Sequence, residues 1–168
     1  MSLRTPEVCL AAVQQGGFAL RYVPEELKTP ELCTAAVQQD GGGEAFCYVP
    51  EELRTPELCI AAVGDHGRAL QYVPRKLRTR ALCLVAVPKD GRALEHVPKK
   101  FRTPALCLVA VQQNGFALKF MPEALKTPEI CVAAVQNDDE AFMFVPWQLH
   151  DEIRAAVARK ANAASSTT

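Results

Sequence analysis

Short apolar runs recur along the chain, and a threonine stands just ahead of each one. The stretch RTPELCIAAV at 54–63 is one example, and near-copies lie at 4–13, 28–37, 78–87, 102–111 and 126–135. Nearly every position within a run is apolar, which predicts a helix that neighbours cover on several sides. Threonine followed by proline is typical of a helix N-terminus, because the hydroxyl caps an unpaired N–H and proline has no N–H to pair.

The remainder of each unit reads as a second, shorter helical segment. Most apolar runs are followed by a glycine, then by A-L-x-Y-V and a proline. The segment should end at that proline, because the residue before a proline avoids the helical region. A last helical turn, P-E-E-L-K, returns one leucine or phenylalanine to the core. A unit this apolar needs stacked neighbours to bury its surface.

The unit recurs every 24 residues, and only the second copy is longer, with two extra residues among the glycines at 41–43. Tandem units that touch only their neighbours form a solenoid. The sequence therefore predicts an all-α solenoid of short helix-turn-helix repeats within 1–150. After the sixth repeat comes a more polar, degraded copy of the first helix of the unit, with Asp151 in place of the threonine cap. It predicts a C-terminal capping helix at 151–163. We expect the tail at 164–168 to be disordered. The predicted repeats are 5–28, 29–54, 55–78, 79–102, 103–126 and 127–150.

Six of the seven cysteines hold one position in successive repeats: Cys9, Cys33, Cys59, Cys83, Cys107 and Cys131. Stacked helices lie about 8 to 10 Å apart, whereas the Cα atoms of a disulfide lie within about 7 Å. No C-x-x-C pair suggests zinc. We expect a ladder of buried, reduced thiols, with no metal and no cofactor. Cys47 lies outside this ladder and is the one candidate for an exposed thiol.

Composition and motifs argue against catalysis. The chain has 168 residues, of which 49% are hydrophobic and 23% charged, and its net charge is zero. No catalytic or nucleotide-binding motif is present, and the three histidines occupy different positions in their repeats. We predict a protein that is not an enzyme. Without an apolar leader or a run of about 18 apolar residues, we expect it in the cytoplasm, with signal-less secretion into a host cell as the alternative.

Charge is the property that changes most between repeats. The two positions after the second proline are acidic in the first two repeats and basic in the next two, and residues 68–102 carry ten basic and two acidic residues. We predict a central basic patch that binds an acidic protein, with nucleic acid as the alternative ligand, no membrane partner, and charge-driven weak self-association as a further outcome. The alternative is that these charged side chains are solvated and bind no partner. The predicted binding residues are Arg75, Lys76, Arg78, Lys99, Lys100 and Arg102, together with Arg68 and Arg92 in the loops.

The unit A-A-V-Q-Q-x-G-x-A-L-x-Y-V-P-E-E-L resembles a family of short tandem helical repeats of unknown function. Its members are found mostly in bacterial and protist proteins, and some are suspected secreted effectors. The resemblance covers residues 3–150 and implies a non-enzymatic helical scaffold for protein–protein interaction, with no catalytic residues to transfer. A weaker similarity, through TPEL and the glycines at 41–43, links the chain to the DNA-reading repeats of transcription-activator-like effectors, whose period is much longer.

Overall fold

The computed structural model describes residues 5–40 and 43–165, with side chains up to residue 159. Within these ranges the regular elements are all helical, as the repeat pattern predicts. The α-helices are α1 (Pro6–Gln15), α2 (Pro30–Gln39), α3 (Pro56–Asp65), α4 (Arg80–Lys89), α5 (Pro104–Gln113), α6 (Pro128–Asn137) and α7 (His150–Ser165). No helix in the described ranges combines the length and the apolar character needed to cross a membrane.

Two 3-10 helices follow each of the first six α-helices. The longer ones are η1 (Gly17–Tyr22), η3 (Ala45–Tyr48), η5 (Gly67–Tyr72), η7 (Gly91–His96), η9 (Gly115–Phe120) and η11 (Asp139–Phe144). The shorter ones are η2 (Glu25–Leu27), η4 (Glu51–Leu53), η6 (Arg75–Leu77), η8 (Lys99–Phe101), η10 (Glu123–Leu125) and η12 (Trp147–Leu149).

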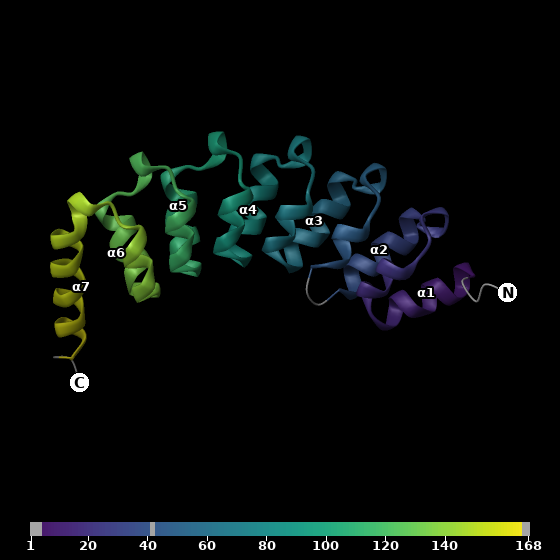
Figure 1. The fold of residues 1–168 in the computed structure, drawn as a ribbon, viewed down its shortest axis with the longest axis horizontal. Coiled ribbons are helices and arrows are strands. Elements are labelled where there is room, and N and C mark those ends of the chain that lie inside the picture. Colours follow the sequence, from purple (N-terminus) through teal and green to yellow (C-terminus); the bar gives the residue numbers. More distant parts are fainter. Residues whose placement is uncertain (1–4, 41–42, 166–168) are drawn as a thin grey trace. The chain divides into compact units, whose positions relative to one another are not determined.

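The chain divides into two compact units. Unit 1 ends at Lys89 and unit 2 begins at Asp90, so the division falls inside the fourth repeat, between α4 and η7. In unit 1, α1 to α4 pack side by side in chain order, and in unit 2, α5 to α7 do the same (Figure 1). Each unit is thus a stack of helical repeats, which confirms the all-α repeat architecture predicted from the sequence.

The threonine caps are confirmed in all six repeats. Each threonine hydroxyl accepts a hydrogen bond from the backbone N–H three residues later, at 3.2 to 3.4 Å. Thr79 caps α4 in this way although arginine replaces the proline after it. This bond satisfies one of the N–H groups that the first helical turn leaves unpaired. The starts of α1 to α6 are therefore set by a contact within four residues of chain.

Helix α7 departs from the predicted cap and from its predicted end. It begins at His150, directly after η12, so Asp151 lies in the first helical turn rather than at the N-cap. The helix continues to Ser165, two residues past the predicted boundary, because alanines at this end favour a helix. The last three residues of the predicted tail, 166–168, lie outside the described residues.

The second segment of each repeat is a 3-10 helix, tighter than an α-helix. In the first repeat η1 ends at Tyr22, Val23 is extended at φ −77° and ψ 129°, and Pro24 follows. The proline therefore ends the segment, as expected from its effect on the preceding residue. Of the glycines that hold the two extra residues, 41–42 lie outside the described ranges, and Gly43 has a φ of 71° that favours glycine.

The cysteine ladder is confirmed as a buried row of free thiols. Its six members are at most 6% exposed, and all seven cysteines of the chain are unpaired. Burial raises the pKa of Cys33 and of Cys131 to about 11, because a thiolate in the apolar core loses its hydration. Cys47 is only half-buried, and burial raises its pKa as well. The ladder cysteines therefore serve as small apolar side chains of the core.

We expect iodoacetamide to modify only Cys47 in the folded protein and all seven cysteines after unfolding in guanidinium chloride. The ladder thiols are buried, and burial also raises the pKa of Cys33, so the reagent has no access to them until the core opens. Intact-mass spectrometry counts the labels in each state. Cys47→Ala is the control, and it should leave the folded protein unlabelled; label on the folded variant would contradict the burial of the ladder.

A basic residue ends each repeat, and Lys28, Arg54, Arg102 and Lys126 each donate from this position to a backbone carbonyl of the next repeat. Lys28 donates from Nζ to the carbonyl of Tyr48 at 3.0 Å, twenty residues along the chain. Arg54 donates from Nη1 to the carbonyl of Tyr72 at 3.1 Å. These carbonyls lie at the end of a 3-10 segment, where the helix leaves them without a partner. We call this position the cation slot, and it is held by Lys28, Arg54, Arg78, Arg102, Lys126 and His150.

Candidate binding surfaces

The short 3-10 helices present two residues each to solvent. Pro74 and Pro98 have extended backbone, with ψ of 139° and 137°, and each precedes a three-residue turn. The turn closes with a backbone bond of 2.8 Å, from the N–H of Leu77 to the carbonyl of Pro74 and from Phe101 to Pro98. The third residue of the turn is half-buried, and the first two are exposed.

Four of the eight predicted binding residues occupy these exposed positions: Arg75 and Lys76 in η6, and Lys99 and Lys100 in η8. Lys76 Nζ lies 3.8 Å from Oε1 of Glu51, and both side chains are about two-thirds exposed or more, at 75% and 67%. An ion pair this open to water contributes little. Lys100 Nζ lies 4.9 Å from the centre of the Phe101 ring. These contacts leave the basic groups accessible to a partner.

Arg78 and Arg102 are half-buried, and backbone carbonyls occupy their guanidinium groups. Arg102 donates to Val97 at 2.9 Å, to Glu95 at 3.1 Å and to Phe120 at 2.5 Å. Arg78 donates to Val73 at 2.8 Å and to Gln71 at 3.0 Å. Burial lowers the pKa of both side chains, because a buried charge loses hydration.

The sequence carries a signal that separates Arg78 and Arg102 from the other predicted residues. They stand in the cation slot, where every one of the six repeats has Lys, Arg or His. The two positions before Leu77 or Phe101 are instead acidic in some repeats, basic in others and uncharged in the last. A residue type that recurs in every repeat is typical of the scaffold. At the variable positions the fold does not require a basic residue, because other repeats have acidic or uncharged residues there.

Arg68 and Arg92, the two predicted loop residues, lie at the start of η5 and η7 and are exposed. Arg68 lines an open hollow of about 310 Å³ in unit 1, together with Glu44 and Tyr72. The guanidinium carbon of Arg92 lies 5.8 Å from the centre of the Phe116 ring in unit 2, within the range of a cation–π contact. Both side chains therefore lie at the surface of their own unit.

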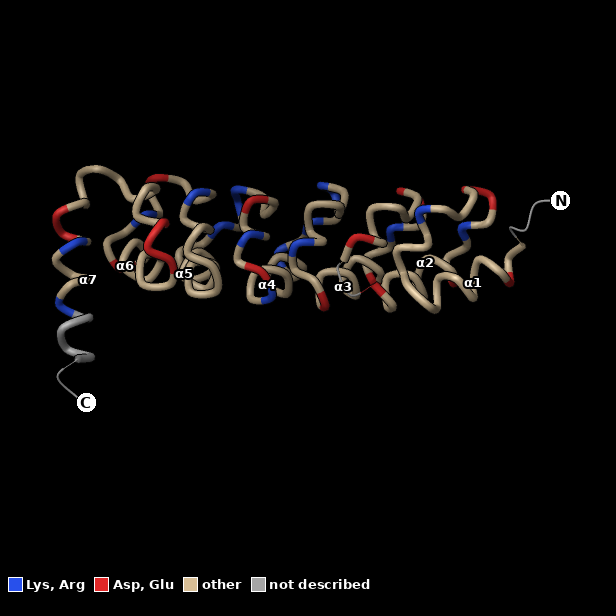
Figure 2. The backbone as a smooth tube through the Cα atoms, turned by 60° about the horizontal axis from the view of Figure 1, so that its bottom comes forward, with Lys and Arg blue, Asp and Glu red and all other residues tan. Residues whose placement is uncertain are grey.

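The structure distributes the eight residues equally between the two units. Unit 1 carries Arg68, Arg75, Lys76 and Arg78, and unit 2 carries Arg92, Lys99, Lys100 and Arg102. Within unit 1 the short turns change from acidic in η2 and η4 to basic in η6, and within unit 2 they change from basic in η8 to acidic in η10 (Figure 2). The basic residues of the predicted patch thus lie in and around two basic turns, η6 on unit 1 and η8 on unit 2.

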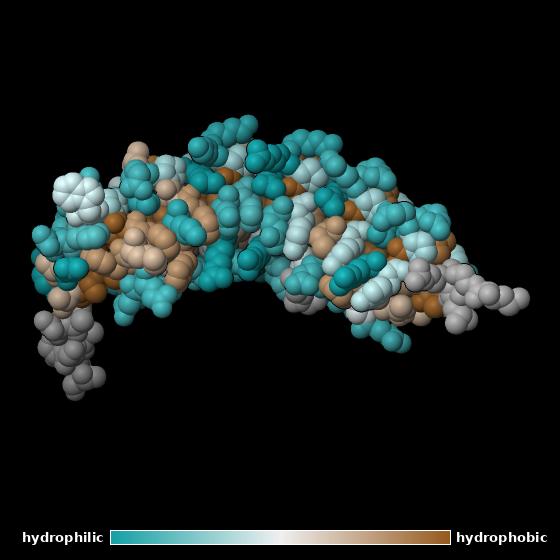
Figure 3. All heavy atoms as spheres, in the orientation of Figure 1, coloured by the Kyte–Doolittle hydropathy of each residue, from teal (hydrophilic) through white to brown (hydrophobic). Residues whose placement is uncertain are grey.

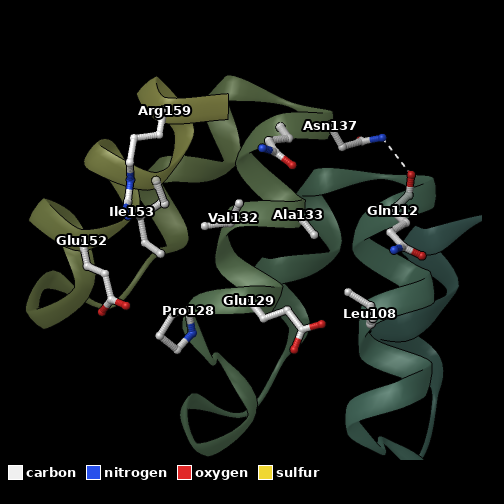
Figure 4. A pocket seen from close by; sticks show the side chains of 12 residues that line it. Leu108, Gln112, Pro128, Glu129, Val132, Ala133, Asn137, Glu152, Ile153 and Arg159 are labelled. Carbon is white, nitrogen blue, oxygen red and sulfur yellow. Dashed lines mark hydrogen bonds between the residues drawn. The ribbon is translucent and has the colours of Figure 1, made fainter. Parts of the chain in front are cut away.

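Sequence reasoning missed an open groove across α5, α6 and α7 in unit 2. It has a volume of about 550 Å³ and a partly apolar floor from Leu108, Val132 and Ala133. Glu129 and Glu152 lie toward one end, and the amides of Gln112 and Asn137 toward the other (Figure 4). Hydrophobic surface is visible over α5 and α6 (Figure 3). Leu108 lies in the apolar run of α5, and Val132 and Ala133 lie in that of α6, where sequence alone also assigns apolar residues to a core.

The described residues also bear on metal binding. Among the described side chains, which lie in 5–40 and 43–159, no group of three or more His, Cys, Asp or Glu could hold a metal ion. The ladder cysteines occupy equivalent positions on successive helices rather than one site. His150 Nε2, in the cation slot, lies 3.1 Å from the carbonyl of Val145.

The fold and its repeated contacts define a helical-repeat protein. Comparison with family models gives the particular family: a domain of unknown function, DUF4116, matches residues 5–54 and 104–150. These segments make up more than half of the 168 residues, so the chain belongs to this family. They correspond to the first two and the last two repeats, which leaves all eight predicted binding residues outside the match. No curated protein and no solved structure matches the chain.

Proposed function

We propose that this protein is a non-enzymatic helical-repeat scaffold that binds other proteins. One observation carries the proposal: the fold uses the residues that recur in each repeat and leaves the variable turn residues exposed. The threonine caps, the ladder cysteines and the cation slot all make structural contacts. The paired residues of η2, η4, η6 and η8 change charge while the scaffold around them stays the same. Exposed loop positions on a rigid scaffold are where binding residues concentrate.

The partner we propose is an acidic protein. Arg75 and Lys76 on unit 1, and Lys99 and Lys100 on unit 2, are exposed cations in a stretch with few acidic residues. Complementary charge raises the rate of association and disfavours basic competitors. Arg68 and Arg92 extend the basic surface of each unit, whereas Arg78 and Arg102 add charge while their donors remain bonded to carbonyls.

Charged contacts on an open surface give little affinity by themselves. The groove of unit 2 supports the proposal because its partly apolar floor can exclude water from a partner's side chains. We propose that the basic turns guide the partner and that the groove of α5 to α7 supplies the apolar contact. The seven free cysteines support a reducing compartment, so we place this binding in the cytoplasm of the producing cell or of a host cell.

Charge reversal tests the role of the basic turns. We expect the parent protein to capture a discrete acidic protein from cell lysate, and expect Arg75→Glu/Lys76→Glu and Lys99→Glu/Lys100→Glu each to weaken that capture by about tenfold or more at low salt. Ala133→Arg, which fills the groove, should weaken it as well. The matched control is Lys119→Glu/Arg154→Glu, which reverses two exposed charges elsewhere on unit 2. Equal capture by all variants would contradict the proposal.

Nucleic acid is the second candidate ligand, because exposed Lys and Arg side chains also neutralise phosphates. Its signature is a linear fall of log affinity with log salt concentration, with a slope set by the number of phosphate contacts. Treating the captured material with nuclease, and measuring retardation of labelled duplex DNA and of RNA at low salt, separates the two candidates. Retardation that the charge-reversed variants lose would favour nucleic acid, and its absence in the parent would remove this candidate.

A further inference from the structure

The groove of unit 2 combines an apolar floor with an acidic end. Leu108 from α5 and Val132 and Ala133 from α6 form the floor, and each of them is half-buried. Glu129 of α6 and Glu152 of α7 lie together toward one end (Figure 4). An occupant of the groove therefore meets aliphatic side chains along its length and two carboxylates at this end.

The fold does not require aliphatic side chains at two of the floor positions. Leu108 and Val132 each follow a ladder cysteine directly. The equivalent residue of α2 is Thr34, whose hydroxyl donates to the carbonyl of Pro30 at 2.8 Å. At the same position of α3, Ile60 is 52% exposed. Aliphatic side chains thus recur at a position that neighbouring repeats do not fully cover, which favours contact with a partner.

Glu129 and Glu152 are not used for contacts between charged groups of the chain. Both side chains are exposed, and neither forms an ion pair with another residue that the structure describes. A carboxylate in the first turn stabilises a helix, but α5 has Ala105 at the position of Glu129. Two carboxylates beside an apolar floor attract a cation and repel phosphates and acidic side chains.

We propose that this groove binds a protein segment in which a lysine or arginine stands next to an aliphatic residue. The cationic group lies at Glu129 and Glu152, and the aliphatic side chain covers the floor at Leu108 and Val132. The methylene stem of lysine or arginine adds apolar contact while its charged end reaches the carboxylates. This inference rests on the proposed function, because the segment belongs to the same acidic partner, whose acidic residues contact the basic turns.

The open form of the groove favours a chain segment over a small molecule. Small-molecule sites bury most of the surface of their ligand, whereas an open groove leaves one side of its occupant uncovered. Such an occupant needs further contacts, and a protein partner supplies them elsewhere. Within the described chain, α7 continues past Arg159, at the edge of the groove, to Ser165 as one helix and does not turn back over the floor.

Fluorescence anisotropy with the full chain and labelled, terminally capped peptides tests the inference. The probe is a peptide of alternating lysine and leucine. In one comparison peptide glutamate replaces lysine, and in the other serine replaces leucine. We expect the lysine–leucine peptide to bind with a dissociation constant on the order of 100 µM, and each comparison peptide to bind about tenfold more weakly or less. Both the charge and the aliphatic side chain are then needed.

Variants of the groove locate the binding. Glu129→Gln/Glu152→Gln removes the acidic end, and Ala133→Arg places a bulky cation on the floor, so each should weaken binding of the lysine–leucine peptide by about tenfold or more. Asp139→Asn/Glu140→Gln is the matched control. It removes two exposed carboxylates of unit 2 that do not line the groove, so the affinity should stay as in the parent. Circular dichroism shows whether each variant is folded.

Three results would overturn the inference. They are no binding of the lysine–leucine peptide, equal binding of the glutamate–leucine peptide, and equal weakening by Glu129→Gln/Glu152→Gln and by its matched control. The charge-reversed variants of η6 and η8 should still bind the peptide. Loss of protein capture in these variants, but not in Glu129→Gln/Glu152→Gln, would also overturn the inference while leaving the proposed function in place. Peptide binding that depends on the groove, without any protein captured by the parent, would support the groove's preference and count against the proposed function.

Discussion

Replacing Gly17 by alanine should lower the free energy of unfolding of unit 1 by about 3 kcal/mol, the upper part of the range for overpacked sites. A Cβ at this position would collide with the carbonyl oxygen of Ala36 and lie 2.9 Å from the backbone N of Asp40. Both obstacles are backbone atoms, one in α2 and one in its C-cap residue, so they cannot rotate away as a flexible side chain can. The first two repeats must separate to admit the methyl group, and denaturation in urea followed by circular dichroism measures the loss.

The same substitution at Gly64 provides the matched control. Gly64 lies near the C-terminal end of α3 in the same unit, and a Cβ there would meet nothing within 4 Å. Alanine is about 0.5 to 1 kcal/mol more favourable than glycine inside a helix. Gly64→Ala should therefore raise the stability of unit 1 while Gly17→Ala lowers it. A loss of similar size in both variants would show that close packing of the repeats is not the cause.

Replacing Arg102 by alanine should lower the free energy of unfolding of unit 2 by about 2 kcal/mol, the middle of the range for leaving buried polar groups unpaired. Its guanidinium donates to the carbonyls of Val97, Glu95 and Phe120, at 2.9, 3.1 and 2.5 Å. The first two belong to its own repeat and the third to the next repeat. Removing the side chain leaves these acceptors without their donor and loosens the contact between two repeats.

Two controls separate this structural role from a role in binding. Arg102→Lys should lose less than half as much stability, because Lys126 makes the equivalent contact to the carbonyl of Phe144 at 3.0 Å. Lys100→Ala removes a cation two residues away that is exposed, and its effect should be within about 0.5 kcal/mol of zero. Chemical denaturation measures all three variants. An equal loss in Lys100→Ala and Arg102→Ala would contradict the assignment of Arg102 to the scaffold.

The two basic turns show that charge in the sequence does not by itself distinguish a binding residue from a residue that supports the fold. Arg75, Lys76 and Arg78 stand close together in sequence, and all three count equally toward a basic patch. In the structure Arg75 and Lys76 are exposed, whereas Arg78 donates to the carbonyls of Val73 and Gln71. The difference follows from the turn geometry, which directs the residue after the half-buried Leu77 back toward the end of η5.

The sequence by itself determined the repeat, its period and the start of the α-helix in each of the six repeats. These features depend on interactions within a few residues, such as the Thr29 hydroxyl with the N–H of Leu32 at 3.3 Å and the break that Pro24 imposes on Val23. The period then placed the cysteines in one buried row. Such short-range rules act in the same way in every copy, so six copies of the pattern reinforce one interpretation.

Only the tertiary structure decided how the remaining surface is used. The donor and acceptor of the Arg102–Phe120 bond are 18 residues apart, and the groove of unit 2 takes residues from three helices. Val8 and Leu58 occupy the same position in their repeats, yet one is 53% exposed and the other 6%. Nearly identical local sequence cannot distinguish these cases, because the difference lies in whether another helix packs against the residue.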